Sequence, residues 1–195
     1  MTNLKFTKYN HDHDCPFEIF LTNLGKYNEG KLVGQWVKMP ATEETIEQVK
    51  KEIGIGTEDY FGVPYEEVFI ADYDQYVEGL YSVLGEYESL NTLNKIATAL
   101  EEMDDETYQK FLALVEDQCL MCGQDVLDLI NDLDKWEFLS DVKNAADYAD
   151  YLINNGTFDF SSCPGIEKYI DRERLGEDEG ADGTFTNFGY IEWRG

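Results

Sequence analysis

The spacing of apolar residues in the first third of the chain predicts a small antiparallel sheet. Residues 17–24 read FEIFLTNL, with apolar side chains at every second position, which is the period of a strand that buries one face. Residues 25–30 are turn formers, and KLVGQWV at 31–37 has the composition of a second strand. The two runs predict a β-hairpin with a longer loop. A third strand is predicted at 68–73.

Apolar residues at helical spacing predict five helices between residues 42 and 153. The first begins with Thr42 as N-cap, carries an apolar stripe and ends at Gly54. From about residue 88 to 133 three short amphipathic helices follow, the second of these three beginning at Asp104 or Asp105 and the third covering 125–133. After a short strand at 136–139, the last helix runs from Ser140 as N-cap to Ile153.

The last forty residues predict a short helix after Pro164, a loop rich in Gly, Asp and Glu at 176–183, and one aromatic strand at 184–193. The predicted fold class is therefore α+β. We expect nine aromatic residues from position 148 onward to form the core of the C-terminal domain, although an interface between two copies would use them as well. They are Tyr148, Tyr151, Phe158, Phe160, Tyr169, Phe185, Phe188, Tyr190 and Trp193.

Charge narrows the classes of function. The 195 residues contain 41 Asp and Glu against 15 Lys and Arg, a formal net charge of −26. Such a chain repels polyanions, which excludes a conventional nucleic-acid binder and attachment to anionic lipid through a basic patch. Intrinsic disorder is excluded too, because 43% of the residues are hydrophobic and 14% are aromatic. A folded protein with a strongly negative surface remains.

The acidic residues are interleaved with the apolar stripes. Residues 101–160 alone carry 16 acids and 3 bases, so these acids must project from the outer faces of folded elements. A solvated surface explains any single acid, but solubility requires a net charge of only about 2–8. A salt-adapted proteome and a weak calcium buffer are the alternatives that remain open at this level.

The net charge can be compared with the phosphate charge of duplex DNA. Duplex DNA carries one negative charge per about 1.7 Å of axis, so 26 charges correspond to about 44 Å, or about 13 base pairs. Such a surface could occupy the basic groove of a DNA-binding protein. The acids expected to take the place of phosphates are Glu43, Glu44, Glu47, Glu66, Glu67, Asp72, Asp74, Glu101, Glu102, Asp104, Asp105, Asp125, Asp128, Asp132, Asp141, Asp147, Asp150, Glu177, Asp178 and Glu179.

One stretch carries a family resemblance. Residues 23–36, NLGKYNEGKLVGQW, closely resemble the opening strand, loop and strand of the ArdA antirestriction family. The likeness continues in order through ADYD at 71–74, LNTL at 90–93, ADYA at 146–149 and GTF at 183–185. It covers roughly residues 17 to 193.

The resemblance implies a DNA mimic, encoded on mobile genetic elements, that inhibits type I restriction-modification enzymes by filling the DNA site of their methyltransferase and specificity complex. It implies no catalysis, no cofactor, no direct binding of nucleic acid and no membrane. The implied architecture is an elongated string of three small domains that forms a homodimer through the last one. On this chain the domains would be 15–86, 87–134 and 135–195, after a flexible extension at 1–14.

Other chemistry finds little support in the sequence. Cys119 and Cys122 have C-x-x-C spacing, but no second pair follows to complete a zinc site. His11 and His13 are the only histidines, which leaves none for a catalytic triad in the core. The run 178–183 begins like a calcium loop but lacks its final glutamate, and the run 72–76 lacks the glycine. Without a secretory signal or an apolar span, the expected location is the cytoplasm, with reduced thiols.

Overall fold

The computed structural model describes residues 13–195, which form two compact units. Unit 1 takes Met1–Met103 and Leu120–Ile130, and unit 2 takes Asp104–Cys119 and Asn131–Gly195. Both units combine helices with a small antiparallel sheet, which confirms the α+β class. The three-domain boundaries stay a prediction. The predicted extension at 1–14 lies outside the described residues, apart from its last two positions.

The sheet of unit 1 has the order β2-β1-β3 and is antiparallel throughout. Phe17 lies opposite Met39 and Thr22 opposite Gly34, which confirms the hairpin. The connection is not a plain turn, because it begins with the short helix α1, where the Asn23 side chain accepts a hydrogen bond from the Lys26 amide at 3.0 Å. The elements are β1 (Phe17–Asn23), α1 (Leu24–Asn28), β2 (Gly34–Met39) and β3 (Val68–Gln75).

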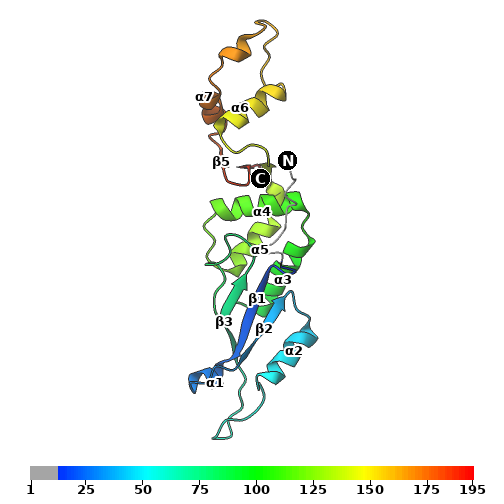
Figure 1. The fold of residues 1–195 in the computed structure, drawn as a ribbon, viewed down its shortest axis with the longest axis vertical. Coiled ribbons are helices and arrows are strands. Elements are labelled where there is room, and N and C mark those ends of the chain that lie inside the picture. Colours follow the sequence, from blue (N-terminus) through cyan, green and yellow to red (C-terminus); the bar gives the residue numbers. More distant parts are fainter. Residues whose placement is uncertain (1–12) are drawn as a thin grey trace. The chain divides into compact units, whose positions relative to one another are not determined.

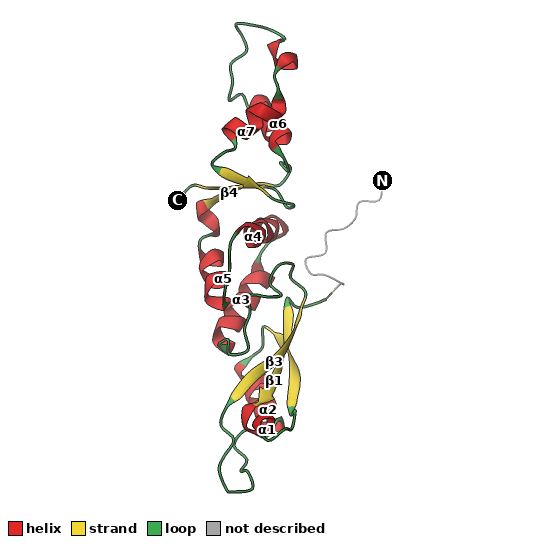
Figure 2. Cartoon of the chain, turned by 90° about the vertical axis from the view of Figure 1, so that its left-hand side faces the viewer, coloured by secondary structure: helices red, strands yellow, loops and turns green. Residues whose placement is uncertain are grey.

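Helices cover only one face of this sheet. In Figure 2, α3 (Leu90–Glu102) and α5 (Gly123–Asn131) lie beside the strands, and the side chains of Phe17, Ile19 and Leu21 are buried on that side. Burial of such side chains is the main stabilising contribution to a unit of this size. The alternate positions of the strands face outward, and Phe20 is half-buried and Asp72 exposed there, whereas Thr22 at the end of β1 is buried.

Helix α2 (Glu43–Glu52) confirms its predicted bounds. The hydroxyl of Thr42 accepts a hydrogen bond from the Thr45 amide at 3.1 Å. Two glutamates lie in its first turn and two lysines in its last, as the helix dipole favours. Figure 1 shows α2 at the side of β2, where its apolar stripe is buried.

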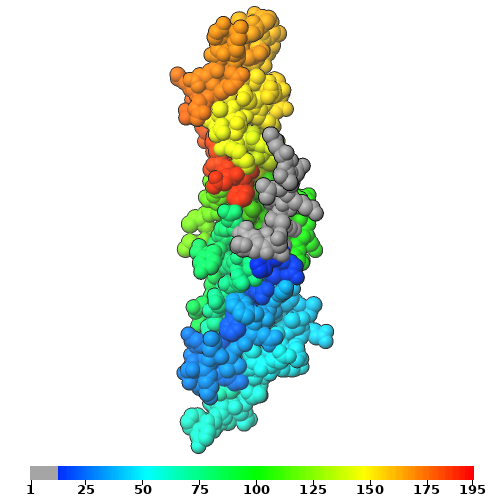
Figure 3. All heavy atoms as spheres, viewed as in Figure 1, coloured from blue at the N-terminus to red at the C-terminus, as the bar shows by residue number. Residues whose placement is uncertain are grey.

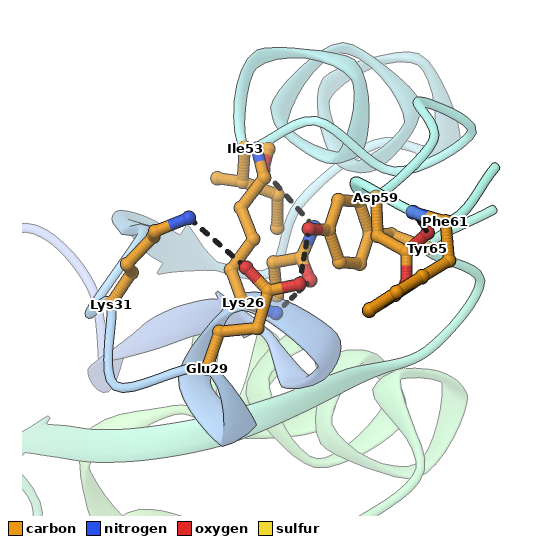
Figure 4. A network of polar contacts seen from close by, with 8 residues as sticks. Lys26, Glu29, Lys31, Ile53, Asp59, Phe61 and Tyr65 are labelled. Carbon is orange, nitrogen blue, oxygen red and sulfur yellow. Dashed lines mark hydrogen bonds and ion pairs between the residues drawn. The ribbon is translucent and has the colours of Figure 1, made fainter. Parts of the chain in front are cut away.

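The 23–36 motif forms a polar network that joins this hairpin to the end of α2 (Figure 4). The Lys26 ammonium donates to the Ile53 carbonyl at 3.0 Å, where a cation satisfies the helix C-terminus. Glu29 accepts from the Tyr65 hydroxyl at 2.6 Å and pairs with Lys31 at 3.1 Å. The Tyr65 hydroxyl, followed by Lys31, lowers the pKa of Glu29, and the same hydrogen bond raises the pKa of Tyr65 to about 12.

Unit 2 is built on a sheet of order β4-β6-β5. Helix α4 begins at the predicted N-cap, since the Asp104 carboxylate accepts from the Thr107 amide at 2.8 Å. The elements are α4 (Asp105–Asp117), the 3-10 turn η2 (Leu133–Lys135), β4 (Trp136–Leu139), α6 (Ala145–Asn154), the 3-10 turn η3 (Ile166–Tyr169), α7 (Arg172–Glu179), β5 (Gly183–Phe185) and β6 (Tyr190–Trp193).

Three predictions in unit 2 are wrong in part. Helix α6 begins after Asn144 and not after Ser140, because Asn144 accepts from the Asp147 amide at 3.0 Å and residues 140–144 turn the chain out of β4. The loop at 176–183 begins inside α7. The single strand at 184–193 is two strands, because the Thr186 hydroxyl and Gly189 close a turn between them.

The aromatic core of unit 2 contains only part of the predicted set. Tyr148 and Tyr190 are buried together with Val142 and Leu152, and Tyr151, Phe158 and Phe185 pack around them. The rings of Tyr148 and Tyr190 stack at 4.4 Å. Tyr169 and Trp193, in contrast, are 77% and 44% exposed and lie outside this core.

A carboxylate is buried at the edge of the same core. Glu192 is only 7% exposed, and it accepts a hydrogen bond from the Tyr190 hydroxyl at 3.1 Å. Arg194 lies 2.8 Å from its other oxygen and also pairs with Glu137 at 2.7 Å. One guanidinium therefore holds two carboxylates on neighbouring strands.

Removing this guanidinium should destabilise unit 2. In Arg194→Met, Glu192 would lose its cation while it stays buried, and we expect the free energy of unfolding to fall by about 1–3 kcal/mol. Urea denaturation followed by circular dichroism measures the change. The matched control is Arg174→Met, whose partner Asp178 is exposed and 4.0 Å away. Equal stability of the two variants would contradict the assignment.

Candidate protein-interaction surface

The acidic residues lie almost entirely on the surface. Residues 13–195 contain 40 of the 41 acids, and among them only Glu192 is buried. Of the twenty acids expected to mimic phosphates, Asp125, Asp132 and Asp147 are half-buried and the others are exposed. The twenty side chains are therefore accessible to a partner on the unit that carries each of them.

In unit 1 these acids come from the helices α2, α3 and α5, from the strand β3 and from a loop. Glu43 and Glu44 occupy the first turn of α2, where the positive end of the helix dipole stabilises them. Asp72 and Asp74 alternate along β3 on the face that α3 and α5 leave uncovered. Glu66 and Glu67 precede β3 in the chain and are exposed.

Four of the twenty acids have a cation beside them, which offsets their charge. Glu47 pairs with Lys50 at 2.7 Å and Asp132 with Lys135 at 2.6 Å. Asp150 pairs with Arg172, and Asp178 lies at the outer limit of an ion pair with Arg174. Three of these pairs are three or four residues apart in the sequence. Sequence reasoning could not find the fourth, because Asp150 and Arg172 meet only through the packing of α6 on α7.

Other acids in the set also stabilise local structure. Asp104 caps α4, and Asp147 accepts from the Lys143 amide at 3.1 Å ahead of α6. Asp125 accepts from the Met121 amide at 2.8 Å. For these residues an asparagine keeps the hydrogen bond while it removes the charge, so amide substitution is the appropriate test of a role in binding.

Three helices end in acids, where the dipole is unfavourable to them. Glu101 and Glu102 end α3, Glu116 and Asp117 end α4, and α7 ends in Glu177, Asp178 and Glu179. None of the three helices has a basic residue in its last turn. An anion at this end costs typically about 0.3–1 kcal/mol. Helix stability therefore does not explain where these acids lie.

We expect amides at these ends to stabilise the protein. The triple substitution Glu102→Gln, Glu177→Gln and Glu179→Gln removes three charges from helix C-termini, and the free energy of unfolding should rise by about 1 kcal/mol. Denaturant titration at low salt measures it. As a control, Glu43→Gln and Glu44→Gln remove acids from a helix N-terminus, so they should lower stability. A triple variant less stable than the wild type would refute the dipole argument.

The described residues hold no cluster of three or more His, Cys, Asp or Glu side chains suited to a metal ion. Asp178 lies within α7, and Asp72 and Asp74 lie within β3, so neither run forms a calcium loop. His11 falls outside the described residues, whereas the ring of His13 stacks on Tyr76 at 3.4 Å. Between residues 13 and 195, no helix is long and apolar enough to cross a membrane.

The four cysteines differ in accessibility. Cys15 is buried, while Cys119 and Cys163 are exposed and Cys122 is intermediate. Burial, followed by the charge of Glu18, raises the pKa of the Cys15 thiol to about 11. The thiolate, which is the reactive form, is therefore scarce at this position.

Thiol labelling should reflect this difference. With a disulfide reagent at pH 8, Cys119 and Cys163 should react first, and Cys15 should react at least about tenfold more slowly until denaturant is added, because it is both buried and protonated. Mass spectrometry of peptides from timed samples assigns each site. Rapid labelling of Cys15 in the folded protein would show that its burial is wrong.

Exposed aromatic residues are the part of the surface that sequence reasoning missed. Trp36 is 43% exposed on β2, and Tyr60 is 95% exposed at the tip of a loop. Figure 3 shows this loop, coloured cyan, as a projection of unit 1. The Asp59 carboxylate holds the loop by accepting from the amides of Phe61 and Val63, each at 2.8 Å. The sequence does contain a sign of this feature at Phe20. This large apolar residue stands at an outward-facing position of β1, where the alternating pattern calls for a polar residue.

These features describe a protein with an accessible, strongly negative surface on an α+β scaffold, whose described part shows no recognisable catalytic centre. A family model described as antirestriction protein (ArdA) matches residues 19–192, and the chain belongs to this family. No curated protein matches the chain. The family comprises antirestriction proteins, which are inhibitors of restriction-modification enzymes and not enzymes themselves.

Proposed function

We propose that this protein is a DNA mimic that occupies the DNA-binding groove of a type I restriction-modification methyltransferase and specificity complex. Its carboxylates would take the place of phosphates and meet the groove's Lys and Arg side chains. Release of the counterions on both surfaces would then drive binding, as it does for DNA. The mechanism is steric and electrostatic competition, with no cofactor and no chemical step.

The position of the acids at helix C-termini is the observation that most supports this proposal. Fold stability disfavours acids there, and net charge far from zero adds self-repulsion in the compact state. Glu116 on α4 also accepts hydrogen bonds from the amide and the side chain of Asn187, at 3.1 and 2.8 Å, which gives it a structural role. A surface that keeps such acids on α3 and α7 has a use for negative charge that outweighs the cost. The net charge equals that of about 13 base pairs of duplex, and this length is comparable to the stretch of DNA that a protein covers.

The test is competition for the methyltransferase complex. A fluorescent duplex that contains the enzyme's recognition sequence is bound at low salt, and the acidic protein is added while anisotropy is read. We expect full displacement, with an apparent affinity that falls steeply as salt rises. The inert control is an unrelated acidic protein of similar net charge. If the duplex stays bound at every concentration, DNA mimicry is wrong.

Homodimer formation through residues 135–195 is a second element of the proposal. Trp193 and Tyr169 are exposed there, and aromatic residues are enriched in protein interfaces. Sedimentation equilibrium of the wild type and of Trp193→Ser would test it. We expect the wild type to sediment as a dimer and the variant to dissociate at lower concentration, whereas a monomeric wild type would remove this element and leave the competition mechanism intact.

A further inference from the structure

The outer face of the unit 1 sheet carries a hollow that the acidic mechanism does not use. It has a volume of about 360 Å³ and is lined by Phe20, Tyr27, Leu32, Trp36, Ala71 and Asp72. Five of these six side chains are apolar or aromatic, and Asp72 supplies the only charge among them. Tyr27, Leu32 and Trp36 belong to the 23–36 motif that carries the family resemblance. That resemblance therefore includes apolar and aromatic residues of the hollow as well as acids.

Strand register builds the floor of this hollow. Phe20, on the central strand, lies opposite Trp36 on one side and opposite Asp72 on the other. The two rings are 5.3 Å apart and tilted by 49°. Gly34 makes room for them, because a Cβ at this position would come within 2.8 Å of the Phe20 ring. The result is an aromatic surface beside a carboxylate.

The surroundings of the hollow are negative. Two residues along the same face, Glu18 lies between Lys38 and Asp74. Lys38 is already paired with Asp14 at 2.7 Å. Within residues 13–195, no ion pair reaches Glu18, Asp72 or Asp74. A cation that enters the hollow would therefore meet carboxylates that form no ion pair within the described part of the chain.

We propose that this hollow binds an arginine side chain of the protein partner. The guanidinium plane would stack on the exposed indole of Trp36 and donate hydrogen bonds to the Asp72 carboxylate, and the arginine stem would cover Phe20 and Leu32. Arginine suits such a site better than lysine, because its guanidinium is planar, weakly hydrated and able to donate to a carboxylate in fork geometry. An anionic or purely apolar group would leave the Asp72 carboxylate desolvated with only the Tyr73 amide, 2.9 Å away, as a donor.

This inference rests on the proposed function for the identity of the partner, because a DNA-binding groove is rich in arginines that grip phosphates. It adds one position-specific contact to a surface that otherwise acts through total charge. Loss of a single acid elsewhere should cost little, whereas loss of the Trp36 ring should be felt. The two mechanisms therefore differ in what one substitution does.

A direct test uses two peptides of equal charge, one that alternates arginine with glycine and one that alternates lysine with glycine. Their affinities are measured by the shift of the Trp36 indole N–H signal in NMR spectra, assigned with Trp36→Phe. For the variants, isothermal calorimetry replaces this signal. We expect the arginine peptide to bind about 3- to 30-fold more tightly than the lysine peptide.

Four variants locate the site. Trp36→Leu, which keeps apolar volume, should abolish the preference for arginine, and Trp36→Phe should keep part of it. Asp72→Asn should weaken binding of both peptides. Tyr60→Leu removes an even more exposed ring outside the hollow and should change nothing. Equal affinity for the two peptides, or a preference that survives in Trp36→Leu, overturns the proposal.

Failure of this inference can be told apart from failure of the proposed function. In the competition experiment, Trp36→Leu should require about 3- to 30-fold more protein than the wild type for half displacement of the duplex. If the wild type competes and Trp36→Leu competes equally well, the arginine site is wrong and DNA mimicry stands. If the wild type does not compete but the arginine peptide still shifts Trp36 selectively, DNA mimicry is wrong and the site stands.

Discussion

Neutralising six acids of unit 1 that form no ion pair with any described residue should lower competition with duplex DNA by about 100-fold at low salt. The variant carries Glu43→Gln, Glu44→Gln, Glu66→Gln, Glu67→Gln, Asp72→Asn and Asp74→Asn, all at exposed positions. An exposed ion pair is worth about 0.2–1 kcal/mol, so six together reach several kcal/mol and one alone changes affinity by less than about fivefold. Anisotropy competition with the methyltransferase complex measures both cases.

Salt dependence gives an independent reading of the same variant. Each acid removed means one ion pair fewer with the enzyme, so binding releases fewer counterions. The slope of log affinity against log salt should therefore become shallower as more acids are removed. The control exchanges the charges of one ion pair, in Glu47→Lys with Lys50→Glu, and leaves the net charge at −26. It should compete like the wild type. A six-site variant with wild-type affinity and slope would mean that unit 1 does not enter the groove.

Replacing Gly176 by alanine should cost about 3 kcal/mol or more of folding free energy, or detach α7 from α6. Gly176 is buried in the middle of α7, and a Cβ there would collide with the backbone carbonyl of Ala145. Backbone cannot move aside as a flexible side chain can, and Ala145 is held as the first residue of α6, directly after its N-cap Asn144. Overpacking against such a site is among the severe destabilising mechanisms.

Urea denaturation and hydrogen exchange measure the two outcomes. A shifted midpoint reports loss of global stability, and faster exchange confined to 172–179 reports detachment of α7. Gly85→Ala is the matched control, because a Cβ at Gly85 meets open space and the backbone there is not left-handed. It should change the free energy of unfolding by less than about 0.5 kcal/mol. An unchanged Gly176→Ala variant would show that α6 and α7 do not approach so closely.

Local sequence signals account for the elements that were predicted well. The β1–β2 hairpin and α2 follow from alternation, from the Thr42 cap and from the stop at Gly54, which act within a few residues of one another. The same is true of α4 and its Asp104 cap. Such signals need no knowledge of distant contacts, because the hydrogen bonds that they describe close within one or two turns.

Elements that depend on distant packing were predicted poorly. The stretch that includes Gly176 and Gly180 has a loop composition, yet residues 172–179 form a helix because the bare Gly176 packs against Ala145. Tertiary contact overrides propensity here. Residues 140–144 have helix-capping character but form a turn, since β4 must pair with β6 before α6 can begin.

The candidate surface divides in the same way. The sign and amount of the charge follow from the amino-acid composition. Its exposure follows from the interleaving of acids with apolar stripes, because a carboxylate without a partner stays in water. Composition cannot say which carboxylates have a cation beside them. Asp150 meets Arg172 across two helices, and Phe20 meets Trp36 across two strands.

By itself, then, the sequence determines an α+β protein of the ArdA family with its acids on the surface. Periodicity is a property of a short segment, and net charge is a sum over all residues. Both can therefore be read from the sequence without the tertiary structure. Which acids remain unpaired, which oppose a helix dipole, and how Phe20, Trp36 and Asp72 come to line one hollow depend on strand register and helix packing. These arise between residues far apart in the chain, and only the folded units bring them together.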